Sequence, residues 1–315
     1  MASRRCLVTG GCGFIGSHLV AALLARGDTV RVLDNLSTGR RANLDALLAD
    51  VELLEGDLRD PDTVRRAVAD VDAVFHQAAL ASVPRSVEAP LPTHDADATG
   101  TLHVLVAARA AGVRRVVYAG SSSAYGDAPT LPKHEEMPVR PLSPYAAAKL
   151  AGEHYCAAFA RSLGLETVTL RYFNIFGPRQ DPQSQYAAVV PRFVMALLAG
   201  RPPTIYGDGT QSRDFTYVDN VVAANLLALE APEASGESIN VACGERYSLL
   251  DLVAALNAAL GTAIAPRHEP RRAGDVQHSL ASIEKAERLL GYRPVVAFGE
   301  GLRRTVAWYQ AQGAD

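Results

Sequence analysis

The feature that most constrains the fold is a glycine-rich turn between a short apolar strand and a helix. Residues 5–9 are typical of a strand, residues 10–16 read Gly-Gly-Cys-Gly-Phe-Ile-Gly, and a helical apolar pattern follows as far as Gly27. Residues 29–33 predict a second strand, which ends in Asp34. The glycines fit two spacings, G-x-G-x-x-G at Gly11, Gly13 and Gly16 and the looser G-x-x-G-x-x-G at Gly10, Gly13 and Gly16. This order of elements predicts a dinucleotide-binding unit.

The acid at the end of the second strand indicates which dinucleotide is bound. Glycines in the turn let a pyrophosphate approach the backbone at the N-terminus of the helix. Asp34 can accept hydrogen bonds from both ribose hydroxyls, whereas its charge would repel a 2′-phosphate. The sequence therefore favours NAD over NADP.

Strand and helix patterns alternate as far as residue 172. Further strands are expected at residues 51–54, 73–77, 115–119 and 168–172, with a helix at 98–111. The alternation predicts an α/β fold with a doubly wound parallel (Rossmann) sheet. Ala78 and Ala79 follow the fourth strand, and such small residues would let a cofactor lie against the backbone. Asp57 follows the third strand, where it could reach an adenine amino group or cap a loop.

The pattern changes in the second half of the chain. Residues 177–182 are rich in turn formers, residues 202–209 look like a strand flanked by breakers, and helices are expected at 190–198, 248–260 and 283–290. We therefore expect an NAD-binding domain over residues 1–173, to which the chain returns near 215–242. Residues 174–315 would form mainly a smaller, mixed α/β substrate-binding cap.

A second constellation begins at Ser143, which is a good helix N-cap and is followed by Pro144 at the first helical position. Tyr145 and Lys149 are four residues apart, so both side chains can point into one site. An ammonium near a phenol stabilises the phenolate, so we expect Lys149 to lower the pKa of Tyr145 and make it a general base. The serines at 121–123 end the fifth strand, at the sheet edge where ligands bind in such folds.

Composition excludes several other classes of protein. The net charge of -3 gives no electrostatic reason to bind nucleic acid or an acidic membrane, and no apolar run is long enough to span a bilayer. None of the four cysteines (Cys6, Cys12, Cys156 and Cys243) forms a C-x-x-C pair. Neither a metal site nor a disulfide framework is therefore expected, and a reducing cytoplasm is the simplest setting.

Taken together, the motifs resemble the extended short-chain dehydrogenase/reductases, and specifically nucleotide-sugar epimerases of the UDP-glucose/UDP-N-acetylglucosamine 4-epimerase type. The resemblance covers nearly the whole chain. The segments that carry it are residues 9–16, 34–39, 56–58, 76–79, 121–127, Tyr145 with Lys149, 171–174, 177–180, 206–209, 213–215 and 272–275.

The resemblance implies a role for each matching residue. NAD would be held by Gly10, Gly13, Phe14, Ile15, Gly16, Asp34, Asn35, Ser37, Thr38, Gly39, Asp57, Leu58, Ala78, Ala79, Tyr145, Lys149 and Tyr172. Tyr145 would be the catalytic base, with Lys149 and either Ser121 or Ser122 assisting. The UDP-sugar would contact Ser121, Ser123, Tyr145, Asn174, Val190, Tyr206, Arg213, Arg272, Asp275 and Ser279.

The reaction implied by the resemblance is inversion at C4 of the sugar. Tyr145 would take the proton of the O4 hydroxyl while C4 passes a hydride to NAD⁺. The 4-keto intermediate would turn over in the site and take the hydride back on its other face. Ser279, seven residues after Arg272, would border the pocket for the C2 substituent, and its small size predicts that an N-acetyl group fits. A homodimer is also expected, built from the helices at 98–111 and 145–162.

Three other interpretations compete with this one. A 4,6-dehydratase of the same family would carry an acid pair after its serine or threonine, where this chain has Ser122 and Ser123. A UDP-glucuronate 4-epimerase would share the base and the cofactor site. A non-catalytic NAD-binding regulator would not need Tyr145 and Lys149.

The sequence also departs from the family pattern at two positions. Asp97 replaces the usual asparagine, which puts the local hydrogen bonding there in question. Ser282 replaces the usual acid and weakens the cap expected for the following helix.

Overall fold

The protein is built around one seven-stranded parallel sheet. The computed structural model describes residues 3–182, 188–271 and 276–313. The spatial order is β11-β6-β5-β4-β1-β2-β3, so the order reverses between β1 and β4. The strands are β1 (Arg5–Thr9), β2 (Thr29–Asp34), β3 (Val51–Glu55), β4 (Ala73–His76), β5 (Arg115–Ser121), β6 (Glu166–Tyr172) and β11 (Glu237–Val241). This arrangement confirms the predicted doubly wound fold.

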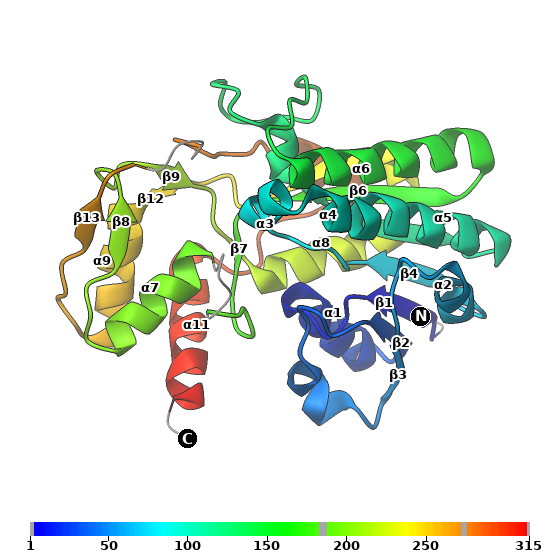
Figure 1. Ribbon diagram of the computed structural model, residues 1–315, viewed down its shortest axis with the longest axis horizontal. Coiled ribbons are helices and arrows are strands. Elements are labelled where there is room, and N and C mark those ends of the chain that lie inside the picture. The colour runs from blue at the N-terminus through cyan, green and yellow to red at the C-terminus, as the bar shows by residue number, and fades with distance from the viewer. Residues whose placement is uncertain (1–2, 183–187, 272–275, 314–315) are drawn as a thin grey trace.

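Helices cover both faces of this sheet (Figure 1). One layer contains α1 (Phe14–Ala25), α8 (Val218–Glu230) and α10 (Glu284–Leu290), and the other contains α2 (Pro61–Val68), α5 (Gly100–Ala110) and α6 (Pro144–Leu163). Successive strand residues point to opposite faces. Val8 accordingly packs in the apolar core on the α1 side, and Leu7 packs in the core on the α6 side.

The connection from β4 to α5 is broken into short helical pieces. It contains α3 (Val83–Glu88), α4 (Pro90–His94) and a π-helical turn, η2 (Asp95–Thr99), that leads into α5. The helix expected at 98–111 thus begins with a wider turn. Such π turns occur frequently at functional sites. Short 3₁₀ turns lie elsewhere, at η1 (Arg41–Leu47), η3 (Ser122–Tyr125) and η4 (Pro232–Ala234).

The cap lies beside the carboxyl ends of the strands (Figure 1). It consists of α7 (Val189–Leu198), α9 (Leu249–Leu260), α11 (Phe298–Gln312) and the strand pairs β8 (Thr204–Tyr206) with β13 (Arg267–Glu269) and β9 (Ser212–Arg213) with β12 (Tyr247–Ser248). A further pair joins β7 (Ile175–Phe176) to β10 (Thr216–Tyr217). The aromatic rings of Phe176, Phe215 and Phe298 pack together in the apolar core of the cap.

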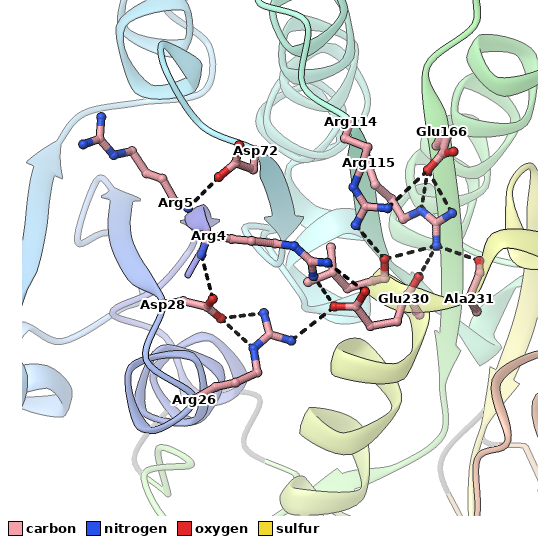
Figure 2. Close-up of polar contacts among 12 residues, drawn as sticks. Arg4, Arg5, Arg26, Asp28, Asp72, Arg114, Arg115, Glu166, Glu230 and Ala231 are labelled. Atoms are coloured by element: carbon pink, nitrogen blue, oxygen red, sulfur yellow. Dashed lines mark hydrogen bonds and ion pairs between the residues drawn. The ribbon is translucent and has the colours of Figure 1, made fainter. Parts of the chain in front are cut away.

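Buried arginines satisfy helix ends at the amino edge of the sheet, opposite the cap. Arg115 on β5 donates to the last carbonyls of α8 and pairs with Glu166 on β6 (Figure 2). Arg31 on β2 does the same for α2, and pairs with Glu52 on β3. The carbonyls at a helix C-terminus lack partners within the helix and carry partial negative charge, so a buried cation stabilises them.

Arg4 pairs with Glu230 at this same edge (Figure 2).

No helix within the described ranges is long and apolar enough to cross a bilayer. The four cysteines are free thiols, and no three His, Cys, Asp or Glu side chains gather as metal ligands among the described residues.

Candidate active site

The glycine turn after β1 has little space for side chains. Gly10 has a φ of +68°, and a Cβ there would lie 2.8 Å from the backbone of Ala78. A Cβ on Gly16 would lie 2.1 Å from the carbonyl oxygen of Gly10. Helix α1 starts at Phe14 and Ile15, after Gly13 as its N-cap, and none of the described side chains caps it. Its first-turn N–H groups are therefore oriented as an anion site requires.

Asp34 ties this turn to the loop after β2. Its side chain is buried, and its Oδ2 accepts from the Cys12 N–H at 2.9 Å while Oδ1 accepts from the Leu36 N–H at 2.8 Å. A Cβ on Gly39 would lie 2.9 Å from the same Oδ2. Burial raises the pKa of Asp34. Each carboxylate oxygen can accept a second bond, so capacity for hydroxyl donors remains.

Residues after β2 and β3 meet above the sheet. The Asn35 amide donates to Asp57 at 2.8 Å, and Asn35 Oδ1 accepts from the N–H of Ser37 in the turn that also holds Thr38. Arg59 contacts Asp57 through its guanidinium at 2.7 Å, which holds the pKa of that carboxyl well below its usual range. Leu58 beside it is buried. Asp57 is thus an ionised loop acid with two protein partners already.

A buried chain of hydrogen bonds fixes the loop after β4. The Ala78 N–H donates to Thr9 Oγ1 at 3.3 Å, and Thr9 Oγ1 is 2.7 Å from His76 Nδ1. On its other side His76 Nε2 is 2.9 Å from Thr101 Oγ1, which donates to the Asp97 carbonyl. The Thr101 proton is therefore used, so His76 must carry its proton on Nε2 and accept from Thr9. The chain holds Ala78, with Ala79 next to it, against the glycine turn.

Ser121, at the end of β5, is the serine that contacts Tyr145. The Ser121 side chain is close enough to the Tyr145 phenol to favour its ionised form and lower its pKa. Ser121 Oγ also lies 2.7 Å from Ser123 Oγ and accepts from the Ser123 N–H. Ser122 begins the η3 turn. Of the two serines left open by the sequence, Ser121 has the geometry to assist Tyr145.

Tyr145 and Lys149 lie near the start of α6, whose first turn is capped by the Ser143 hydroxyl as predicted. The expected pKa of Tyr145 was wrong for the protein alone. The pKa of Tyr145 is raised to about 12, chiefly by burial; the neighbouring Ser121 hydroxyl acts to lower it and the charge of Asp97 acts to raise it. The Lys149 ammonium instead lies 4.3 Å from the centroid of the Tyr118 ring. Lys149 is thus held over an aromatic face, where it does not offset the burial of Tyr145.

Tyr172 ends β6 within a polar chain of its own. Its hydroxyl donates to Gln77 Oε1 at 3.1 Å and accepts from Asn225 Nδ2 at 2.8 Å. Burial raises the pKa of Tyr172 to about 12. This neutral phenol joins the loop after β4 to helix α8.

Two expected substrate residues meet where the sheet and the cap join. Asn174 Nδ2 donates to the Asp214 carbonyl at 3.0 Å and lies 3.4 Å from Ser279 Oγ. Asn174 has a φ of 42°, a left-handed conformation that places its side chain at this junction. Arg213 donates to the carbonyls of Ser212 and Gln277. Ser279 is therefore anchored beside Asn174.

A cavity of about 170 Å³ opens in the cap beside Tyr206. It is lined by Tyr206, Gly207, Asp208, Gln211, Arg271, Val276 and Gln277. Val190, expected to contact substrate, is instead buried in the apolar core of the cap. Arg272 and Asp275 lie outside the described residues.

Sequence reasoning missed the side chains beneath the site. Thr9, His76 and Tyr118 are fully buried, and each reaches its partner on a different element. His76 was part of the motif at residues 76–79, but nothing local indicated its two threonine partners. Tyr118 is the one aromatic residue in β5, and this was the only sign in the sequence that it has a special role.

The comparisons with known proteins agree on one family. Residues 6–242 match the NAD dependent epimerase/dehydratase family. The UDP-glucose 4-epimerase of Mycolicibacterium smegmatis is 42% identical over 310 residues, 97% of this chain and 98% of that protein.

Solved structures give the same result. UDP-N-acetylglucosamine 4-epimerase from Methanobrevibacter ruminantium, in complex with UDP-N-acetylmuramic acid, has a TM-score of 0.95 at 41% identity and covers 99% of this chain and 100% of its own. UDP-glucose 4-epimerase from Thermus thermophilus, in complex with NAD, has a TM-score of 0.88 at 42% identity. The match covers 97% of this chain and 99% of that one.

Proposed function

The chain belongs to the NAD-dependent epimerase/dehydratase family, and from this premise we propose that it inverts C4 of a UDP-linked hexose. The observation that carries the proposal is the convergence of Ser121, Tyr145 and Lys149 at the carboxyl edge of the sheet. In open α/β sheets this edge, at the point where strand order reverses, is where ligands bind.

The residues around the glycine turn fit a bound NAD. A side chain at Gly10 or Gly16 would collide with backbone, and the first turn of α1 presents its N–H groups for a pyrophosphate. Asp34 retains acceptor capacity for ribose hydroxyls. When bound, NAD would supply a reversible hydride acceptor for the sugar carbon.

Tyr145 is the group that would move the proton. It would take the proton from the O4 hydroxyl and return it after the sugar has turned over. Ser121 lies beside the phenol and would keep it directed at that hydroxyl. Because the pKa of Tyr145 is about 12 in the protein alone, the base needs positive charge brought close when the site fills. A bound oxidised nicotinamide would add this charge to that of Lys149, which stays over the Tyr118 ring.

The second half of the chain would hold the UDP group while the sugar turns. Arg213 and Asn174 lie at the junction with the cap, and Tyr206 lines a cavity beyond it. A planar guanidinium suits a diphosphate, and an aromatic wall suits a base. Ser279 beside Asn174 leaves room at the C2 position, so we propose that both plain and N-acetylated hexoses are substrates. UDP-glucuronate is the second candidate, because it would use the same base.

The test is to incubate the protein separately with UDP-glucose, UDP-N-acetylglucosamine and UDP-glucuronate and to separate the products by chromatography. We expect the 4-epimers of the first two, with no net accumulation of NADH. A product formed from UDP-glucuronate alone would replace this assignment, and stoichiometric NADH would indicate a dehydrogenase instead.

A further inference from the structure

We infer that Asp97 is the counter-charge of Lys149, a positioning residue that holds the ammonium in place. The inference deepens the proposed function and rests on it for the role of Lys149. It concerns Asp97, the position where the resemblance described above leads one to expect an asparagine.

The carboxyl group of Asp97 is completely buried in the π-helical turn η2. Its Oδ1 accepts from the N–H of Leu80, in the loop after β4, at 2.7 Å. Its Oδ2 has no hydrogen-bond partner anywhere in residues 3–182, 188–271 and 276–313. A buried carboxylate oxygen without a donor is unfavourable unless positive charge lies nearby.

Lys149 supplies that positive charge. Helix α6 packs against η2, and the Lys149 side chain is buried. Tyr118 supports the lysine from below, because its hydroxyl donates to the Lys149 carbonyl at 3.1 Å while its ring faces the ammonium. A ring face attracts a cation, but it carries no net charge. Burial raises the pKa of Asp97 and lowers that of Lys149, and against this burial each charge favours the charged form of the other.

The other titratable groups around this pair are neutral. His76 on β4 has a pKa lowered to about 3 by burial, so it is uncharged. Burial raises the pKa of Cys156 on α6 to about 12, and raises those of Tyr145 on α6 and Tyr118 on β5 as well. Among these groups, the Asp97 carboxylate and the Lys149 ammonium are thus the two that carry charge, and each compensates the other.

An asparagine at position 97 would interact with Lys149 differently, because its side chain carries no net charge. Its amide oxygen could still accept from the Leu80 N–H, but its NH₂ group would face the ammonium with positive hydrogens. The aspartate keeps the loop bond and adds a negative charge. Burial lowers the pKa of Lys149 and raises that of Tyr145, and on top of burial the Asp97 charge acts to raise both. Removing the Asp97 charge should lower the pKa of both residues. The ionisations of Lys149 and Tyr145, and any rate that depends on them, should therefore shift to lower pH.

The chain offers a direct measurement, because it contains three lysines, Lys133, Lys149 and Lys285. Protein labelled with ¹³C at the lysine ε-carbon should give three signals, and Lys149→Met identifies the one of interest. We expect Asp97→Asn to lower the pKa of Lys149 by about one unit. Asp95→Asn is the matched control, because Asp95 lies in the same turn with an exposed side chain. It should leave the Lys149 titration unchanged.

The activity of the purified enzyme gives a second readout. In Asp97→Asn both limbs of the kcat/KM profile should move down in pH, whereas a purely structural role would lower the height of the profile and leave its limbs in place. Asp97→Glu keeps the charge and should restore the profile. If Asp97→Asn does not fold, Asp97→Ser makes the same test with a smaller neutral side chain.

The two proposals can fail separately. An identical Lys149 titration in the parent and in Asp97→Asn, or an equal shift in Asp95→Asn, would overturn the role of Asp97. A parent enzyme that turns over no UDP-sugar would overturn the proposed function and leave the lysine titration as an independent result.

Discussion

The Ser121 hydroxyl lies beside the Tyr145 phenol and favours its ionised form, although the two residues belong to different elements of the fold. Ser121 ends a central strand, and Tyr145 lies in the first turn of α6. The strand end is rigid, and the helix is fixed by the Ser143 cap. The pair is therefore pre-organised, which is how a catalytic base gains efficiency without moving to its substrate.

Tyr145→Phe should abolish most of the epimerase activity. The substitution keeps the ring and its packing but removes the hydroxyl that takes the proton, so kcat should fall by at least about 100-fold. The measurement is turnover of UDP-glucose, with the melting temperature as a check of folding. Tyr155→Phe is the control, because Tyr155 lies on the same helix with its side chain exposed, and its activity should be unchanged. Near-normal turnover by Tyr145→Phe would rule out the proposed base.

Asp34→Ala should weaken NAD binding. The change removes the acceptor expected for the ribose hydroxyls and also frees the N–H groups of Cys12 and Leu36, which hold the turn closed. We expect an increase in Kd of at least about tenfold, measured by calorimetry on protein stripped of nucleotide. Glu55→Ala is the matched control, since Glu55 is the cross-strand neighbour of Asp34 but is exposed. If the parent, Asp34→Ala and Glu55→Ala all bind NAD with the same affinity, Asp34 does not contribute to NAD binding.

Arg115→Met should destabilise the fold without altering the chemistry. Arg115 is buried and donates to the carbonyls of Ala228 and Ala231 at the end of α8 (Figure 2). Its loss leaves these carbonyls unsatisfied, so the free energy of unfolding should fall by about 3 kcal/mol. Chemical denaturation measures this.

Arg114→Met is the control for that experiment. Arg114 is adjacent in sequence, half-exposed and 3.9 Å from Glu166, and it donates to the Leu229 carbonyl, which Arg115 also contacts. That carbonyl keeps its Arg115 donor when Arg114 is lost, so stability should change by less than about 1 kcal/mol. The kcat of both variants should stay normal at low temperature, because this edge is opposite the site. A change in kcat for Arg115→Met alone would show that the two edges are coupled.

The protein should form a dimer through the outer face of α5 and α6. On α6, Leu150 and Phe159 are buried within the subunit, whereas Tyr155 and Ala158 are exposed. Val106 on α5 is also exposed, and the two helices pack side by side. Light scattering at micromolar concentration should give twice the chain mass.

Replacing Val106 with glutamate should shift that mass to the monomer, because a charge would be buried in the apolar contact. Val295→Glu is the control, because Val295 is at least as exposed and lies after α10, away from α5 and α6. A parent protein that is monomeric at this concentration would contradict the prediction.

Features set by local spacing could be predicted from the sequence. The glycine turn, Asp34 and the Tyr145–Lys149 helix face are each defined within a few residues. Helix α8 was not predicted, because it is buried on nearly all sides and therefore lacks an amphipathic stripe. The raised pKa of Tyr145 could not be predicted from the sequence either, because it depends on burial and on Asp97, which is distant in sequence and close only in the fold. Arg115 reaches a carbonyl 113 residues later for the same reason.

The substrate range should depend on the volume at Ser279. Ser279 Oγ lies 3.4 Å from the amide of Asn174, and both residues border the region where the sheet meets the cap. A tyrosine at this position would fill the space that an N-acetyl group needs, so Ser279→Tyr should lose UDP-N-acetylglucosamine selectively. We expect the ratio of kcat/KM for the N-acetylated sugar to that for UDP-glucose to fall by at least about tenfold.

Ser279→Ala separates the effect of volume from that of the hydroxyl. It removes the contact with Asn174 but leaves the space open, so the ratio of the two kcat/KM values should stay close to that of the parent. If Ser279→Tyr lowers kcat/KM for both sugars equally, the tyrosine has disturbed the anchor at Asn174, which both substrates would share. If the parent ignores N-acetylated sugars, some other residue closes the pocket. Both variants lack the serine hydroxyl, but only the tyrosine fills the space. A fall confined to the N-acetylated sugar in Ser279→Tyr, and missing in Ser279→Ala, therefore identifies side-chain volume at this position as the determinant.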